Sequence, residues 1–189
     1  MAAPAQANQE QEGPIEALIR AGLHREAAAA CAHTHGASIG RLCMAMLGGQ
    51  AEAEEALQDT LLAAHDAMAS YRGEGSVRAW LFGIARRVCA RRLESRTRQS
   101  ERLHLLHDAD ADAALPDEVI DARRRAHTIR AALATLPPSE REALLLHYQA
   151  DLSYREIGCA CGIDEAAARK RASRGLEKLR VHLQREDPR

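Results

Sequence analysis

Near the C-terminus, two segments with helical periodicity are separated by a short turn at Gly162, a pattern typical of a helix-turn-helix and also found in other helical hairpins. Residues 153–156, with the sequence SYRE, form a capping box in which serine caps a helix and glutamate follows three residues later. Gly158 is small enough for two helices to approach closely, and Gly162 can adopt the positive φ of a tight turn. Asp164 is placed to cap the next helix. The segment therefore predicts a helix-turn-helix.

The helix predicted after this turn has one apolar face and one basic face. The inner face consists of Ala168, Ala172, Leu176 and Leu179. The opposite face carries Arg169, Lys170, Ser173 and Arg174. Side chains of these types contact base edges and phosphates when a recognition helix enters the major groove. We therefore expect this face to bind DNA.

A further helix is expected from Ala126 to the prolines at 137–138, with an apolar face that includes Leu133. The sequence SERE at residues 139–142 resembles a second capping box, so Ser139 is predicted to cap the helix that follows. Together with the helix-turn-helix, these elements make one small helical domain.

The first half of the chain predicts helices with narrow apolar faces. An alanine-rich helix is expected over about residues 15–35. The next apolar face consists of Ile39, Leu42, Cys43, Met46 and Leu47, before Gly48 and Gly49 end the helix. A second face consists of Ala53, Ala56, Leu57, Thr60, Leu61, Ala64 and Met68. A third helix follows a cap at Ser76 and buries Val77, Trp80, Leu81, Ile84 and Val88.

The composition agrees with an all-α fold built from two small helical domains. Hydrophobic residues make up 46% of the 189 residues and aromatic residues only 3%, so strand formers are scarce and the cores are thin. No glycine-rich phosphate loop and no run of eighteen apolar residues occurs. The polar, acidic N-terminus has no apolar stretch typical of a secretion signal, and we expect a cytoplasmic protein.

A net charge of −1 conceals two basic blocks. Residues 1–75 have a net charge of −6, whereas residues 76–103 have +6 and residues 164–180 have +3. For either block alone, the alternative to a binding role is that its arginines simply keep a helix surface in contact with water. Two such blocks on separate helices favour two contacts with a nucleic acid.

Phe82 and Arg86 lie one turn apart on the third helix, on the face opposite its apolar stripe. An exposed ring beside an arginine suits stacking on unpaired bases. Alternatively, Phe82 packs against a neighbouring helix. The sequence leaves both interpretations open.

The predicted organisation has a disordered tail at 1–14 and a first domain at 15–97. An acidic flexible linker with Pro116 follows at 98–125, then a second domain at 126–183 and a short tail at 184–189.

Two segments resemble the sigma-70 family of bacterial transcription initiation factors. Residues from about 25 to 97, which include AEAEEALQDTLLAAHDA and GSVRAWLFGIARR, are similar to the −10 domain of these proteins. Residues 126–183, which include SYREIGCACGIDEAAARKRASRG, are similar to their −35 domain. The short chain resembles the extracytoplasmic-function (ECF) group. This resemblance implies a factor that carries core RNA polymerase to promoters and assists promoter melting.

The resemblance also implies roles for individual residues. Glu55, Gln58 and Asp59 match a motif that binds core polymerase. The residues expected at the −10 element and in melting are Arg78, Phe82, Arg86, Arg87 and Arg91. Those expected at the −35 element are Arg169, Lys170, Ser173 and Arg174. Trp80 matches a core position, and the acidic linker matches a segment that threads the RNA path of the polymerase.

The implied partners are core RNA polymerase, promoter DNA and an anti-sigma factor, without a small-molecule substrate, a cofactor or membrane insertion. We expect no enzymatic activity, because no nucleophile–base or paired-carboxylate motif occurs. A stand-alone helix-turn-helix regulator is one alternative, although it leaves the face of Glu55 unexplained. A metal or thiol sensor is another, because Cys31, His33, His35, Cys159 and Cys161 offer ligands. Their spacings are not those of known zinc sites, and the five cysteines are otherwise expected as buried apolar residues without disulfides.

Overall fold

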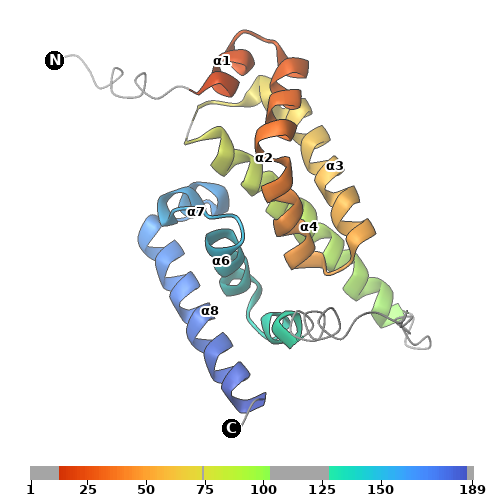
Figure 1. Cartoon of the computed structure of the whole chain (residues 1–189), viewed down its shortest axis with the longest axis vertical. Coiled ribbons are helices and arrows are strands. Elements are labelled where there is room, and N and C mark those ends of the chain that lie inside the picture. Colours follow the sequence, from red (N-terminus) through yellow and green to blue (C-terminus); the bar gives the residue numbers. More distant parts are fainter. Residues whose placement is uncertain (1–12, 74, 103–127, 187–189) are drawn as a thin grey trace, which may run out of the picture.

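The computed structural model describes residues 13–73, 75–102 and 128–186, and within these ranges all regular secondary structure is helical (Figure 1). The N-terminal domain contains α1 (Pro14–Arg20), α2 (His24–Leu47), α3 (Gln50–Ala67), the short 3-10 helix η1 (Met68–Ser70) and α4 (Val77–Arg102). The C-terminal domain contains a helical segment at 128–134, then α6 (Pro138–Tyr148), α7 (Tyr154–Cys161) and α8 (Glu165–Glu186). The predicted all-α class is confirmed.

In the N-terminal domain, α2, α3 and α4 pack side by side (Figure 1). Gly48 ends α2 with φ of 86°, a left-handed conformation that glycine adopts without a steric penalty. The Ser76 hydroxyl accepts a hydrogen bond from the Ala79 amide at 3.1 Å, which confirms the predicted cap of α4. The predicted apolar faces of all three helices lie in one core, with Trp80 half-buried at its edge.

The start of the N-terminal domain differs from the prediction. The single helix expected at 15–35 is divided at Gly22, which has φ of 74°, into α1 and α2. From His24 onwards α2 continues without a break to Leu47 and includes the face predicted around Ile39. Alanine supports this long helix because it loses little entropy on helix formation.

The helix-turn-helix forms as predicted. The Ser153 hydroxyl accepts from the Glu156 amide, and the Glu156 carboxylate accepts from the Ser153 amide at 2.9 Å, which completes the capping box. Gly162 has φ of 67°, and the Asp164 carboxylate accepts from the Ala167 amide at 2.6 Å. A Cβ atom on Gly158 would lie 2.7 Å from the Ile163 carbonyl oxygen, so only glycine permits this approach.

The predicted cap at Ser139 is wrong. Helix α6 begins at Pro138, Pro137 holds the N-cap position, and no side chain caps the helix. Proline is favourable in the first turn because its φ suits the helix and it has no amide to satisfy. Glu140 is instead 8% exposed, and its two carboxylate oxygens accept from Lys178 Nζ of α8 at 3.0 and 2.8 Å.

Helix α4 runs to Arg102, beyond residue 97, where the predicted first domain ends. The remainder of the predicted linker, residues 103–125, lies outside the described residues, as do the predicted N-terminal tail up to residue 12 and residues 187–189. None of the helices in the described ranges combines the length and hydropathy needed to cross a bilayer.

The two domains are packed against each other. Helix α7 lies against α4, and α6 contacts α2, while α8 runs along the side of the C-terminal domain that is remote from α3 (Figure 1). A Cβ atom on Gly83 of α4 would lie only 3.0 Å from the Ala160 carbonyl oxygen of α7. Gly83 thus allows the two backbones to meet, and we call this contact between α4 and the α6–α7 segment the interdomain seam.

Candidate nucleic-acid interface

The basic face of α8 is open to solvent. Arg169, Lys170, Ser173 and Arg174 are all exposed. Ala168 and Ala172 turn into the core on the opposite side and are 0% and 2% exposed. Gly175 brings α8 close to α6, where a Cβ atom would lie 3.0 Å from the Glu140 carbonyl oxygen. This packing holds the helix by one side and leaves the other for a ligand.

The predicted −10 residues of α4 divide into two groups. Arg87 and Arg91 are exposed. Arg78, Phe82 and Arg86 instead face the C-terminal domain across the interdomain seam, with Phe82 fully buried and the two arginines half-buried. The predicted set is therefore on one helix, but only part of it is accessible in this arrangement.

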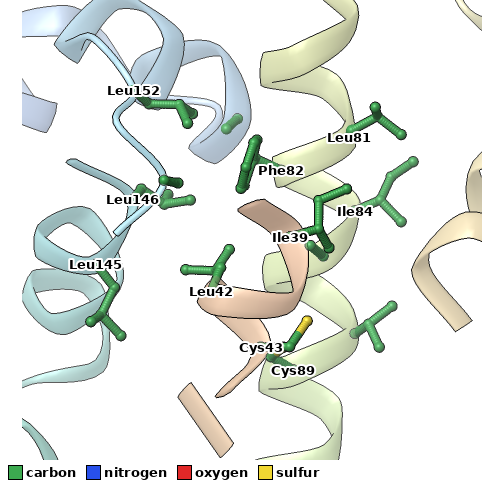
Figure 2. Packing of buried hydrophobic residues seen from close by; sticks show 14 of the residues in the cluster. Ile39, Leu42, Cys43, Leu81, Phe82, Ile84, Cys89, Leu145, Leu146 and Leu152 are labelled. Atoms are coloured by element: carbon green, nitrogen blue, oxygen red, sulfur yellow. The ribbon is translucent and has the colours of Figure 1, made fainter. Parts of the chain in front are cut away.

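The Phe82 ring occupies the seam. It is 0% exposed and belongs to the same apolar cluster as Leu146 and Leu152 of the C-terminal domain. Figure 2 shows the ring directed from α4 towards these leucines, while Leu81 and Ile84 point to the other side of the helix. Of the two interpretations that the sequence leaves open, packing against neighbouring helices is the one seen here.

Arg86 forms an ion pair across the seam. Its Nη1 atom lies 2.9 Å from the Glu142 Oε2 atom of α6, and the two side chains are only 21% and 14% exposed. Arg86 Nε is buried without a partner among the described residues. Because a half-buried guanidinium is costly to leave unpaired, Glu142 offsets the cost of covering Arg86 when the domains are closed.

Arg78 binds the turn between α6 and α7. Its Nη2 atom donates to the carbonyl oxygens of Ala150 at 2.5 Å and Asp151 at 2.9 Å. Asp151 has φ of 53°, a left-handed conformation that aspartate tolerates better than most residues. Two successive carbonyl groups of the turn thus hold the arginine.

Glu156 links the helix cap of α7 to the seam. Its carboxylate lies 3.9 Å from Arg78 Nη1 and accepts from the Ser76 hydroxyl at 3.3 Å. Burial alone would raise the pKa of Glu156, but the Ser153 amide and hydroxyl and the charge of Arg78 outweigh burial. The pKa therefore lies below its usual value, and the carboxylate is ionised in the closed arrangement.

The acidic residues of α3 form a separate exposed face. Glu55, Gln58 and Asp59 are all exposed. Arg92 of α4 donates to Glu55 at 3.0 Å and to Asp59 at 2.6 Å. The arginine orients the two carboxylates without covering them, since their side chains remain 66% and 52% exposed.

Leu62 extends this face, and sequence reasoning missed it. The side chain is 65% exposed, although it lies in a helix whose other leucines are half-buried. It follows Gln58 by four residues and Asp59 by three, so it shares their side of the helix. The sequence did contain a sign of this position, since Leu62 is an apolar residue at helical spacing from an otherwise acidic face.

In the part of the chain that the structure describes, the cysteines and histidines are not gathered into a metal site. No group of three or more metal-ligating side chains comes together among the described residues. Cys31, Cys43 and Cys89 are buried as expected, whereas Cys159 is exposed. Burial and the charge of Glu16 raise the pKa of Cys31 to about 11, so its thiol stays protonated. Cys31, one of the ligands on which the sensor alternative relies, is therefore buried and protonated.

Comparison with known proteins identifies the two domains. Residues 32–99 match the sequence model described as Sigma-70 region 2, and residues 126–179 match that of Sigma-70, region 4. The sigma factor CarQ of Myxococcus xanthus is 34% identical, over 73% of this chain and 78% of its own length. The ECF sigma factor SigW of Bacillus subtilis is 29% identical, over 77% of this chain and 82% of its own length.

Two solved structures share the fold. CnrH, solved in complex with the cytosolic domain of CnrY, matches 92% of this chain with a TM-score of 0.67 and 19% identity, over 99% of its own length. RpoE from Bartonella quintana, solved with the anti-sigma factor NepR, matches 81% with a TM-score of 0.63 and 22% identity, over 94% of its own length. The order of the two matched regions and the similarity to CarQ agree with this architecture. The chain belongs to the sigma-70 family, as an RNA polymerase sigma factor of the ECF group that directs promoter-specific initiation of transcription.

Proposed function

We propose that three separate faces divide the work of initiation. The face of Glu55, Gln58 and Asp59 on α3 docks on core RNA polymerase. The −10 element is bound and opened by Arg78, Phe82, Arg86, Arg87 and Arg91 on α4. The −35 element is bound by Arg169, Lys170, Ser173 and Arg174 on α8. The observation that carries this proposal is that the acidic face of α3 and the basic face of α8 are exposed at the same time, on different domains.

Binding at the −10 element then requires the domains to separate. Arg78, Phe82 and Arg86 cannot reach DNA while α6 and α7 cover them. Polymerase supports the open state if it holds the two domains apart at promoter spacing. Once free, Phe82 can stack on an unpaired base, a contact worth roughly 1–3 kcal/mol. Such stacking offsets the cost of unstacking a base pair, which is a few kcal/mol.

The mechanism is binding and remodelling without a catalytic step. We place the protein in the cytoplasm with the polymerase that it serves, and its ligands are core polymerase and promoter DNA. An anti-sigma factor is the proposed regulatory partner, because the RpoE structure that shares this fold contains one. No small-molecule substrate or cofactor enters this scheme.

Charge reversal on α3 tests the docking face. Glu55→Arg with Asp59→Arg places positive charge on both sides of Arg92, and we expect core polymerase to be lost in co-purification. Glu55→Gln with Asp59→Asn removes the negative charge but keeps oxygen atoms that can accept from Arg92. This variant shows whether polymerase is lost because the charge is gone or because the domain no longer folds. Glu26→Arg, on an exposed position of α2, is the matched control and should retain polymerase.

Run-off transcription with the same variants completes the test. The reversed variant should give no promoter-dependent transcript, whereas Glu26→Arg should match the wild type. If reversal at Glu55 and Asp59 leaves both attachment and transcription intact, the docking face is wrong. A chain that binds DNA but neither co-purifies with core polymerase nor supports run-off transcription would instead be a stand-alone regulator.

A further inference from the structure

The Arg169 side chain is held in place before any DNA is present. Its guanidinium carbon lies 5.2 Å from the centre of the Tyr154 ring, within the range of a cation–π contact. On the same helix, Arg169 Nη2 lies 2.7 Å from the Glu165 Oε1 atom, one turn away. Among the four residues predicted to contact the −35 element, Arg169 is the one with both an ion pair and a ring contact within the described structure.

The ring that contacts Arg169 is itself fixed by its surroundings. Tyr154 is the first residue of α7 and directly follows Ser153 of the capping box. Its ring stacks on His147 of α6, with ring centres 4.5 Å apart and planes 23° apart. His147 Nδ1 in turn lies 2.9 Å from the Leu152 carbonyl oxygen. Tyr154 thus rests on the end of α6 and the turn after it, as well as contacting α8 through Arg169.

Ordering matters for arginine because its free side chain has many rotamers. Immobilising such a side chain at an interface costs about 0.5–1.5 kcal/mol, and a residue that is already ordered avoids part of this cost. Arginine reads a guanine through two hydrogen bonds with fixed geometry, so a held guanidinium also favours one base over another.

We propose that Tyr154 is a positioning residue for DNA recognition, which orients Arg169 towards the base edges of the −35 element. The proposal rests on the function proposed above for α8 and adds a residue outside the recognition helix. Tyr154 acts through Arg169, whereas Lys170 and Arg174 supply the phosphate contacts.

The test is a double-mutant cycle in the full chain. The probe is a DNA duplex that the wild-type protein selects from a random-sequence pool, and affinity is measured by fluorescence anisotropy. Tyr154→Ala should weaken binding by about twofold to fivefold, the value of an exposed cation–π contact. Tyr154→Phe keeps the ring and should bind like the wild type. In an Arg169→Ala background, Tyr154→Ala should cause no further loss.

Tyr154→Leu separates positioning from folding. Leucine keeps the apolar volume against His147 but has no ring face for Arg169, so it should weaken binding as alanine does. Selection repeated with Tyr154→Leu and with Arg169→Ala should relax the preference for the same base. Thermal unfolding followed by circular dichroism shows which variants fold, and the leucine and phenylalanine variants decide the result if alanine unfolds the domain.

Two results would overturn the proposal. If Tyr154→Ala weakens binding equally with and without Arg169, the tyrosine acts on its own. If Tyr154→Phe binds as poorly as Tyr154→Ala, the hydroxyl contacts DNA directly. Failure of the underlying function looks different, because the wild-type chain would then select no duplex, or Arg169→Ala would have no effect.

Discussion

Helices α4 and α8 carry similar chemistry in opposite situations. Both are long, both are rich in arginine, and both are expected to meet the same promoter. The basic face of α8 is open to solvent, whereas Arg78, Phe82 and Arg86 of α4 lie under α6 and α7. The domain that presents the proposed −35 face is thus the one that covers part of the proposed −10 face.

This difference indicates an order of events. In the closed arrangement the chain can offer α8 to duplex DNA, but it cannot offer the whole of α4 to a separated strand. The covered residues are those proposed to contact the separated strand of melted DNA. Such a contact is useful only after polymerase has bound. With the roles proposed for α4, the closed seam limits the contact of the free factor with single-stranded DNA.

The largest expected effect comes from reversing the charge at the seam. Glu142→Arg places a second cation beside Arg86, and breaking this poorly solvated pair should destabilise closure by about 3 kcal/mol. The domains should separate, which small-angle X-ray scattering records as a larger radius of gyration. Glu177→Arg, on an exposed position of α8, is the control and should leave the scattering unchanged.

Gly83 offers a route to the same state without a change in charge. Gly83→Ala introduces a Cβ atom 3.0 Å from the Ala160 carbonyl oxygen and should also loosen the seam. Gly175→Ala meets the Glu140 carbonyl oxygen at the same 3.0 Å, but within one domain. It should lower the melting temperature of the C-terminal domain without opening the seam. Compact scattering for both Glu142→Arg and Gly83→Ala would refute our account of closure.

The salt dependence of DNA binding gives an effect of intermediate size that distinguishes the exposed face of α8 from the covered residues of α4. Arg174→Ala in the free chain should reduce the slope of log affinity against log salt by about 1, because one phosphate contact is lost. Arg78→Ala should leave this slope unchanged, since its guanidinium is bound to the carbonyls of Ala150 and Asp151. In the Glu142→Arg background, Arg78→Ala should reduce the slope too. Equal effects of both substitutions in the wild-type background would show that α4 is already accessible.

The smallest expected effect is a dependence of stability on pH at Glu156. Its pKa in the folded chain lies below the ordinary value of 4.5, so the ionised carboxylate stabilises the fold above pH 4.5. This stabilisation is lost as the pH falls through the lower folded value. Glu156→Gln should therefore reduce the free energy of unfolding by about 1 kcal/mol at pH 7, and the difference from wild type should shrink as the solution is made acidic.

Urea unfolding at pH 7 and in acidic solution measures this effect. Ser153→Ala removes the hydroxyl that donates to Glu156 and should reduce the pH dependence in the same direction. A constant difference between wild type and Glu156→Gln at both pH values would mean that the carboxylate charge plays no part in the fold.

Elements set by neighbouring residues could be predicted from the sequence. The capping box at Ser153, the turn at Gly162, the cap at Asp164 and the end of α2 at Gly48 all formed as expected. Each depends on hydrogen bonds or backbone angles within a few residues, so the pattern contains the whole cause. The exception at Ser139 shows the limit, because Pro137 and Pro138 start the helix earlier and Glu140 turns to Lys178 of another helix.

The candidate site was predictable in part for the same reason. Alternation around each helix placed Arg169 and Lys170 outside and Ala168 inside, because a helix that buries one stripe must expose the other. The acidic face of α3 could be predicted from the same alternation. The contact of Arg169 with Tyr154 could not be predicted, since the two residues lie on different helices and meet only because of the angle between these helices.

The sequence by itself determined most of the helices, most of their caps, their main apolar faces and the two basic blocks, since these arise from residues close together in the chain. Only the tertiary structure decided that Phe82 packs into the second domain and that Arg86 pairs with Glu142, 56 residues away. Local periodicity predicts from which face of a helix a side chain projects. It does not predict whether that side chain contacts solvent, DNA or another helix, because that depends on how the domains pack.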